Sequence, residues 1–139
     1  MIYKDNHFIK KQRIFVFNMN KALISIGSNE DRESNIALCR QMLNATFGDV
    51  NYSKTSVTPP YGNIYKNDFL NQLAVVTTDK EENEISYLLK QMEREMGRSR
   101  KDKITGKVVI DIDLVIWNDK VLKPEDLHRK YVAELLESF

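Results

Sequence analysis

The sequence has little net charge, one cysteine and no long apolar run, and each shortage excludes a class of protein. With 21 Lys and Arg against 20 Asp and Glu, the net charge is +1, so a bulk field for nucleic acid or an anionic membrane is absent. The single Cys39 excludes a disulfide framework and any Cys/His zinc spacing. The chain shows no apolar run long enough to span a bilayer and no secretory h-region. We therefore expect a cytoplasmic protein whose partners are small molecules.

Length and patterning predict one globular domain. The 139 residues are 42% hydrophobic and 29% charged, which is ordinary for a chain with a single core. Neither an internal repeat nor a low-complexity linker interrupts the pattern. Residues 1–19 are basic and aromatic, and we interpret them as an N-terminal extension of a domain at 20–139. The extension is expected to add an edge strand or to contact a second copy, which predicts a monomer or a weak homodimer.

The most informative stretch is 108–117, VVIDIDLVIW, which is β-branched and aliphatic and predicts a strand. Side chains alternate along a strand, so the even positions from 108 to 116 form one apolar face. Asp111 and Asp113 then lie side by side on the other face, with Cα atoms roughly 6.5–7 Å apart. Two carboxylates that close repel each other unless a cation lies between them. The pair predicts a divalent metal site, and the alternative is a solvated strand face answered by lysines.

A basic motif lies just upstream of this strand. Arg98 and Arg100 follow Gly97, which is a good residue for a helix to end on. Guanidinium groups bind phosphate oxygens in bidentate fashion. The polar loop at 99–107 is expected to be mobile in the empty protein and to close over a charged ligand. An acidic pair with a mobile basic pair suits a magnesium-bound polyphosphate.

The order of elements predicts an α+β fold. The expected strands are 22–26, 51–58, 69–78 and 108–117. The first expected helix begins near residue 31, the second runs from about residue 81 to residue 96, and a short helix is expected over 124–139. This β-α-β-β-α-β order is the ferredoxin-like pattern. It predicts a four-stranded antiparallel sheet with helices on one face and an active-site cleft on the other.

Three further positions carry two interpretations each. Pro59-Pro60 makes a stiff segment that either walls a pocket or forms a plain rigid turn. Asn71 is an amide inside an apolar strand, so it either reads the edge of a heterocycle or satisfies a neighbouring loop. Cys39 falls in the apolar period of the first helix, which favours a small core residue over a nucleophile.

In order along the chain, these motifs resemble the 6-hydroxymethyl-7,8-dihydropterin pyrophosphokinase (HPPK) family of folate biosynthesis. The similarity spans about Lys21 to Leu127. The motifs that carry it are Ile26-Gly27-Ser28-Asn29, Thr58-Pro59-Pro60-Tyr61-Gly62, Asp68-Phe69-Leu70-Asn71, Glu93, Gly97-Arg98-Ser99-Arg100 and Asp111-Ile112-Asp113-Leu114. Each motif alone is weak, whereas the ordered series at this spacing is specific.

The resemblance implies an ATP-dependent transferase, a kinase that passes diphosphate to a pterin. The pterin hydroxyl attacks the β-phosphorus of ATP, AMP leaves, and two Mg²⁺ ions bridge the reactants. By motif, the metal ligands are Asp111 and Asp113, and the catalytic residues are these two with Arg98 and Arg100. The nucleotide-binding residues are Glu93, Arg98, Arg100, Lys107 and Leu114, and the pterin-binding residues are Thr58, Pro59, Tyr61, Phe69 and Asn71.

The sequence departs from the family pattern in two places. Thr105 and Val108 stand where the family has Trp and Arg, and Lys107 offers a charge but no bidentate fork. Near the C-terminus, the family aromatic that stacks on the pterin has no evident counterpart. A second hypothesis is therefore a divergent paralogue that binds a magnesium nucleotide with little or no pyrophosphokinase activity. An RNA-binding module is disfavoured, because the aromatic strand motif for base stacking is absent.

Overall fold

Five strands form one antiparallel sheet in the computed structural model, which describes residues 19–60, 62 and 65–139. The strands are β1 (Asn20–Ser28), β2 (Val50–Thr58), β3 (Phe69–Thr78), β4 (Asp111–Trp117) and β5 (Lys120–Val121). Their order across the sheet is β2-β3-β1-β4-β5. The predicted N-terminal extension at 1–19 falls almost wholly on residues 1–18, which lie outside the described residues.

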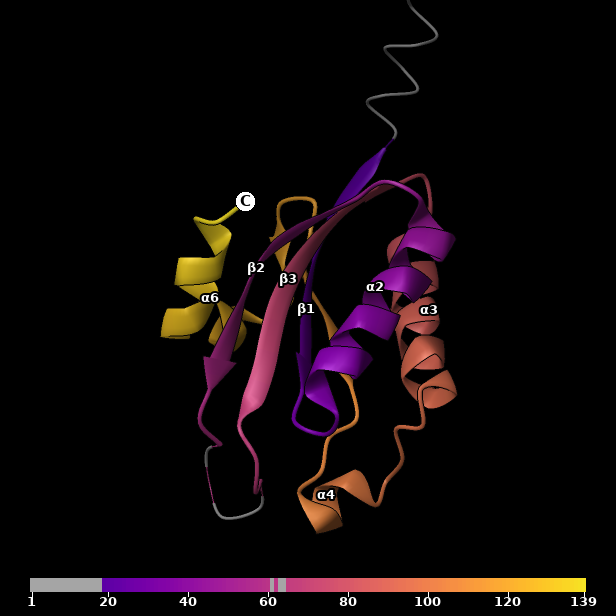
Figure 1. Cartoon of the computed structure of the whole chain (residues 1–139). Helices are drawn as coiled ribbons and strands as arrows, with labels where there is room; N and C mark the ends of the chain where they lie inside the picture. Colours follow the sequence, from indigo (N-terminus) through magenta and orange to yellow (C-terminus); the bar gives the residue numbers. More distant parts are fainter. Residues whose placement is uncertain (1–18, 61, 63–64) are drawn as a thin grey trace, which may run out of the picture.

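Two long helices pack on one face of this sheet, as Figure 1 shows for α2 (Arg32–Phe47) and α3 (Glu82–Glu95). Both carry apolar residues at helical spacing, and these are the side chains that the sheet buries. The buried apolar residues are Ile36, Cys39 and Leu43 from α2, and Ile85, Leu89 and Met92 from α3. Gly97 follows α3 with a φ of 97°, a backbone conformation that favours glycine.

The α+β class is confirmed, and the arrangement is consistent with the ferredoxin-like pattern. The first four strands and two long helices follow the predicted order, and every neighbouring pair of strands is antiparallel. The two-residue β5 is an addition to the predicted four strands. It pairs with the end of β4 through Ile116 opposite Val121 and Trp117 opposite Lys120.

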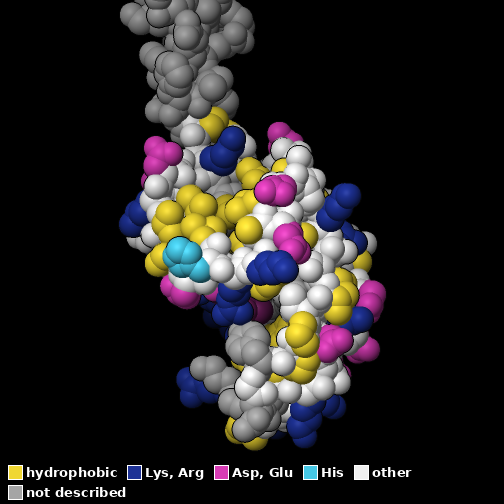
Figure 2. Space-filling view, turned by 90° about the vertical axis from the view of Figure 1, so that its left-hand side faces the viewer, with side chains coloured by type: hydrophobic (Ala, Val, Ile, Leu, Met, Phe, Trp, Pro, Cys, Tyr) yellow, Lys and Arg dark blue, Asp and Glu magenta, His cyan; other side chains and the backbone are white. Residues whose placement is uncertain are grey.

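The second face of the sheet is not free of helices, so the prediction of helices on one face only is wrong. Two short helices, α5 (Pro124–Leu127) and α6 (Lys130–Leu136), replace the predicted single helix. α6 lies against the far side of the sheet from α2 (Figure 1) and forms a second apolar cluster there. The buried members of that cluster are Leu23, Leu73, Val115, Val132 and Leu135. On this side, Figure 2 shows hydrophobic side chains gathered together, with basic and acidic side chains interspersed around them.

A β-bulge in β4 changes which of its side chains face each of the two hydrophobic cores. The pairing with β1 shifts between Leu23, opposite Ile116, and Ile24, opposite Leu114, so Val115 is the extra residue. Before the bulge, Ile112 and Leu114 belong to the core under α2 and α3. After it, Ile116 packs with the α6 cluster. The prediction that all even positions share one face is therefore wrong beyond the bulge, and the strand begins at Asp111 rather than Val108.

The segment before β4 is tied to the turn after β1. Asn29 donates from its side chain to the Gly106 carbonyl (2.9 Å) and accepts from the Val108 N–H (2.5 Å). The Asn29 N–H also donates to the Val108 carbonyl (3.0 Å). The predicted mobile loop contains a one-turn helix, α4 (Asp102–Thr105). In the part of the chain that the structure describes, no helix combines the length and apolar character that a membrane span requires.

Candidate functional site

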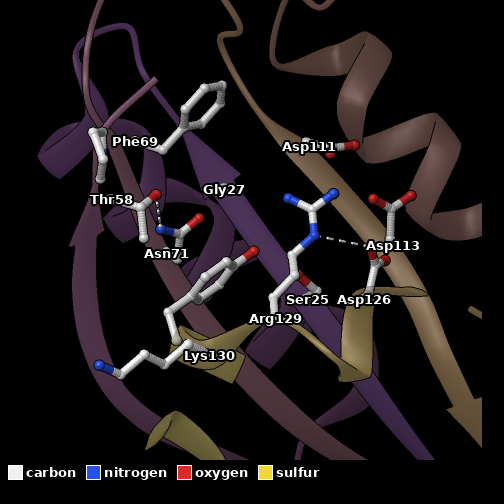
Figure 3. Close-up of a pocket in the computed structure, with 12 residues that line it drawn as sticks. Ser25, Gly27, Thr58, Phe69, Asn71, Asp111, Asp113, Asp126, Arg129 and Lys130 are labelled. Atoms are coloured by element: carbon white, nitrogen blue, oxygen red, sulfur yellow. Dashed lines mark hydrogen bonds and ion pairs between the residues drawn. The ribbon is translucent and has the colours of Figure 1, made fainter. Parts of the chain in front are cut away.

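A hollow of about 360 Å³ lies on the face of the sheet that carries the aspartates. Its floor is β1, its sides are β2, β3 and β4, and α5 and α6 cover part of it (Figure 3). The lining residues that bear on the site are Ser25 and Gly27 from β1, Thr58, Phe69 and Asn71 at one end, Asp111 and Asp113 at the other, and Asp126, Arg129, Lys130 and Tyr131 from the cover. Six predicted site residues from three distant motifs, Thr58, Pro59, Phe69, Asn71, Asp111 and Asp113, are therefore brought together.

The β2–β3 end of the hollow presents an amide beside an aromatic ring. The Asn71 side-chain nitrogen donates to the Thr58 hydroxyl (2.9 Å) and to the Ser56 carbonyl (3.2 Å). Both donors of the amide are thereby satisfied by the neighbouring strand, as one of the two interpretations of Asn71 predicts. Among the described residues, the Asn71 carbonyl oxygen has no hydrogen-bond partner, so it remains an acceptor for a ligand.

Gly27 leaves space at the bottom of this end of the hollow, because it has no side chain. It pairs across β1 and β3 with Asn71, and a Cβ atom there would lie 3.4 Å from the Asn71 amide oxygen and 3.8 Å from the Phe69 ring. The hydrogen atom of glycine therefore leaves the amide edge and the ring face open to the hollow. Phe69 itself is held by an edge-on contact with Tyr65, with ring centroids 5.2 Å apart.

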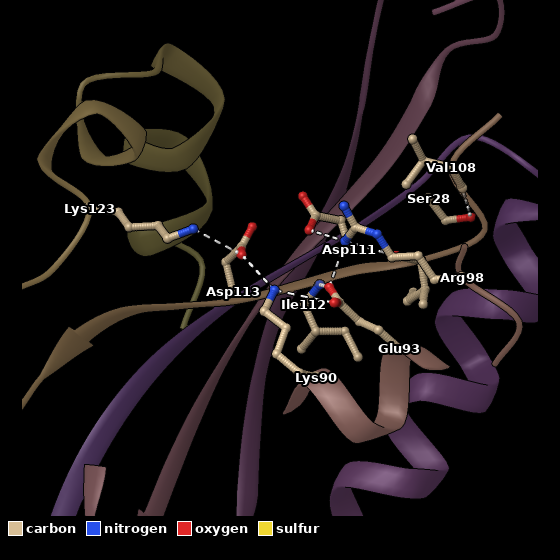
Figure 4. A network of polar contacts seen from close by, with 10 residues as sticks. Ser28, Lys90, Glu93, Arg98, Val108, Asp111, Ile112, Asp113 and Lys123 are labelled. Carbon is tan, nitrogen blue, oxygen red and sulfur yellow. Dashed lines mark hydrogen bonds and ion pairs between the residues drawn. The ribbon is translucent and has the colours of Figure 1, made fainter. Parts of the chain in front are cut away.

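The aspartate end is already engaged by cations from the chain (Figure 4). Asp111 Oδ1 accepts from an Arg98 guanidinium nitrogen at 2.6 Å. Asp113 Oδ1 accepts from Lys123 Nζ at 3.0 Å, and Lys90 Nζ lies 3.5 Å from the same oxygen. The Asp111 side chain is 41% exposed, whereas that of Asp113 is 16% exposed. The two carboxylates are thus unequal, and Asp111 is the one open to a ligand.

The same contacts make the pKa values of the two carboxyl groups differ. Partial burial, together with the charge of Asp113, raises the pKa of Asp111 to about 6, against the opposing effect of Arg98. Burial also acts to raise the pKa of Asp113, but the hydrogen bond and charge of Lys123 outweigh it and lower that pKa. Above pH 6 both groups are ionised, which is the state that a hard cation requires.

Glu93 is buried and organises the site from the α3 side. Its side chain is 5% exposed and accepts from Arg98 at 2.7 Å, from the Ile112 N–H at 2.7 Å and from Lys90 at 3.2 Å. Arg98 is therefore gripped between Glu93 and Asp111. In this arrangement Glu93 acts on the hollow through Arg98 and the β4 backbone, in place of a direct contact with the hollow.

The residues present fit a divalent cation that is bound by one or two carboxylates together with phosphate oxygens. They do not form a set of protein ligands that would surround a cation completely. Carboxylate oxygens are the ligands that Mg²⁺ prefers, and Mg²⁺ is commonly bound by one or two carboxylates with phosphate oxygens. Among residues 19–60, 62 and 65–139, no three His, Cys, Asp or Glu side chains are grouped to hold a metal. Asp126 lines the same hollow, but Arg129 Nε lies 3.6 Å from its Oδ1, and Figure 3 shows this guanidinium pointing toward the β4 aspartates.

The other predicted nucleotide residues lie around the aspartates and outside the first hollow. Arg100 lines a second hollow of about 590 Å³ beside Arg98 and Glu93. Leu114 is buried and lines a third, of about 200 Å³, which also includes Asp113. Lys107 is exposed.

Two of the predicted pterin-binding residues, Pro59 and Tyr61, differ in whether the structure places them. Pro59 lines the first hollow beside Thr58, and Tyr61 lies outside the described residues. Of the two departures from the family pattern, Thr105 is exposed at the end of α4, and Val108 is buried beside Asn29.

Sequence reasoning missed Lys123, Lys90 and the covering residues of α5 and α6. A signal for Lys123 exists in the turn at Asn118-Asp119, because a tight turn there folds the chain back along β4. With Ile116 opposite Val121, a residue near position 124 comes to lie across from Asp113. Lys90 and Arg129 carry no such local signal, since their proximity depends on how α3 and α6 pack.

A comparison with protein families matches most of this sequence to a known family. Residues 23–139 match the family described as 7,8-dihydro-6-hydroxymethylpterin-pyrophosphokinase (HPPK). The match covers most of the chain and both ends of the hollow, so the chain belongs to the HPPK family. The recognition of this family from the sequence is confirmed.

One solved structure shows a distant likeness. It is the crystal structure of the Bacillus subtilis YXEP protein, described as a dinuclear metal binding peptidase from the M20 family. The identity is 11%, the TM-score is 0.29, and the alignment covers 74% of this chain and 26% of that chain. A likeness this weak bears on neither fold nor function.

Proposed function

We propose that this chain transfers diphosphate from ATP to 6-hydroxymethyl-7,8-dihydropterin. The observation that carries the proposal is the continuous hollow that joins the Asn71 amide to the Asp111 carboxylate. A flat acceptor at one end brings its hydroxymethyl oxygen toward phosphates at the other. Phosphoryl transfer depends on such positioning and on charge neutralisation more than on a covalent group of the protein.

The acceptor end suits a pterin ring. The Asn71 oxygen accepts from an N–H of the heterocycle, while the Phe69 ring packs on its flat surface. Thr58 holds the Asn71 amide in place, and Pro59 with Tyr61 is proposed to wall the pocket. These roles predict that a bulky side chain at position 27 blocks the acceptor without disturbing the nucleotide.

The nucleotide end suits a magnesium triphosphate. Arg98 and Arg100 are proposed to bind phosphate oxygens, with Lys107 adding a charge, and the apolar hollow beside Leu114 is proposed to take the base. Asp111 and Asp113 would hold Mg²⁺, which when bound supplies charge neutralisation on the phosphates. Glu93 keeps Arg98 in position beside them.

The direct test is AMP release from ATP in the presence of the dihydropterin and magnesium. The wild-type chain is expected to release one AMP for each diphosphorylated pterin. Asp111→Asn is expected to lose at least about 100-fold in rate, since a transition-state charge contact is commonly worth 10²–10³. Asp119→Asn, in the exposed turn after β4, is the matched control and should keep full activity. Absence of AMP release at any magnesium concentration contradicts the proposal.

A second candidate is a family member that binds a magnesium nucleotide but transfers diphosphate slowly. The observation that favours it is the engagement of both aspartates by Arg98, Lys90 and Lys123, together with the buried Val108 where the family has Arg. Calorimetry with a non-hydrolysable ATP analogue separates the two candidates. Tight analogue binding without AMP release supports the second, whereas tight binding of the dihydropterin counts against it.

A further inference from the structure

The charges around the aspartate pair are balanced before any ligand is added. Among the described residues near the two β4 aspartates, four carboxylates meet four cationic side chains. The carboxylates are Glu93, Asp111, Asp113 and Asp126, and the cations are Lys90, Arg98, Lys123 and Arg129. Both β4 aspartates therefore already have cationic partners within the chain.

Lys123 is held at Asp113 by the backbone. The N–H groups of Leu122 and Lys123 both donate to the Val115 carbonyl, at 2.8 and 3.3 Å. These bonds fix the chain just after β5, so the Lys123 ammonium reaches Asp113 Oδ1 at 3.0 Å from an anchored position.

Asp113 has little room left for another cation. Its side chain is 16% exposed, and a second ammonium, that of Lys90, lies 3.5 Å from the same oxygen. Asp111 differs, because its side chain is 41% exposed and is paired with Arg98 at 2.6 Å. A divalent ion that enters from the hollow therefore meets Asp111 first.

We propose that the Lys123 ammonium takes the place of one of the two divalent ions that the family resemblance implies. The chain then binds a single divalent ion with its nucleotide, at Asp111, while Lys123 neutralises Asp113. This inference rests on the proposed binding of a magnesium nucleotide. It makes Lys123 a positioning residue, since it acts on the ligand through Asp113.

Native mass spectrometry of the whole chain with Mn²⁺ and a non-hydrolysable ATP analogue tests the inference by counting ions. The wild-type complex is expected to carry one Mn²⁺ for each bound analogue. Lys123→Met, which keeps the length of the side chain and removes its charge, is expected to carry two. Lys120→Met is the matched control, because Lys120 pairs with Glu82 at 3.6 Å and is 66% exposed, and it should carry one.

Each result of this count decides the inference. Two ions in the wild-type complex overturn it, and so does one ion in a Lys123→Met complex that still binds the analogue. Should Lys123→Met fail to fold, Lys123→Gln repeats the test, and the wild-type count alone still decides whether a second ion is present. A wild-type chain that binds no analogue at any Mn²⁺ concentration gives no complex to count. That outcome refutes the proposed nucleotide binding itself and the inference with it.

Discussion

At the scale of single residues, Glu93 connects α3 to the aspartate strand. Its carboxylate receives Arg98, Lys90 and the Ile112 N–H within 3.2 Å. Glu93→Ala leaves a guanidinium and a buried N–H without their acceptor, so we expect the free energy of unfolding to fall by roughly 3–5 kcal/mol. Urea denaturation measures the change, and Glu95→Ala, on the exposed side of the same helix, should change it by less than about 0.5 kcal/mol. Equal effects of the two substitutions would disprove the role.

Asp111 predicts a pH dependence of stability with a definite sign. Its pKa is about 6 in the folded chain against the ordinary 3.8, so the folded state binds more protons between these values. Stability linked to this group is therefore full below pH 3.8 and is lost as the pH rises toward 6. Asp111→Asn stays neutral, so its stability relative to the wild type should increase from pH 4 to pH 6 and then level off. Thermal unfolding of both proteins across this range checks the prediction, and a constant difference would refute it.

At the scale of elements, α6 belongs to the folding core as well as to the cover of the hollow. Leu135 is 4% exposed and packs against the second face of the sheet, whereas its neighbour Leu136 is 39% exposed. Leu135→Ala is expected to cost about 2–5 kcal/mol through a lost contact and a cavity. Leu136→Ala is the matched control and should cost about 0.5 kcal/mol or less. Similar midpoints for the two variants in urea would show that α6 does not pack on the sheet.

The elements that sequence predicted well are those fixed by local periodicity. β3 follows from a bounded apolar run and α3 from a helical apolar pattern, and their observed bounds differ from the predicted ones by at most one residue. The bulge at Val115 was missed because an extra residue in a run of β-branched side chains leaves no mark on the pattern. The position of α6 was missed because the apolar pattern of a short amphipathic helix does not indicate which face of the sheet the helix packs on.

The same limit applies to the candidate site. Asp111, Asp113 and Asn71 were found because charged and amide groups are conspicuous inside apolar strands. Lys90 was missed because lysines on a helix surface are usually solvated, and its contact with Asp113 depends on how closely α3 approaches β4. Ion pairs between distant elements follow from packing, which composition and spacing do not encode.

At the scale of the whole molecule, the rate at which the single thiol, Cys39, reacts with a reagent measures how often the chain unfolds. Cys39 is fully buried under α2, and burial raises its pKa to about 12, so the thiol is neutral at pH 8. We expect an aromatic disulfide reagent to label the native chain at least about 1,000-fold more slowly than the urea-unfolded chain, which corresponds to an opening free energy of about 4 kcal/mol. Comparable labelling rates in water and in urea would place Cys39 outside the core. Glu93→Ala and Leu135→Ala should both accelerate the reaction.

The Asn29 bonds to Gly106 and Val108 have a consequence for the seven residues between Arg98 and Gly106. Arg98 is gripped at one end by Glu93, and Gly106 is tethered at the other by Asn29. A segment with both ends pinned samples far fewer arrangements than a free tail, so ordering it on a ligand costs less conformational entropy. Arg100 therefore has a restricted range of positions from which it can contact an anion. Removing the Arg98–Glu93 contact or the Asn29–Gly106 bond should lower the rate of anion binding at a smaller perturbation than is needed to destabilise the fold.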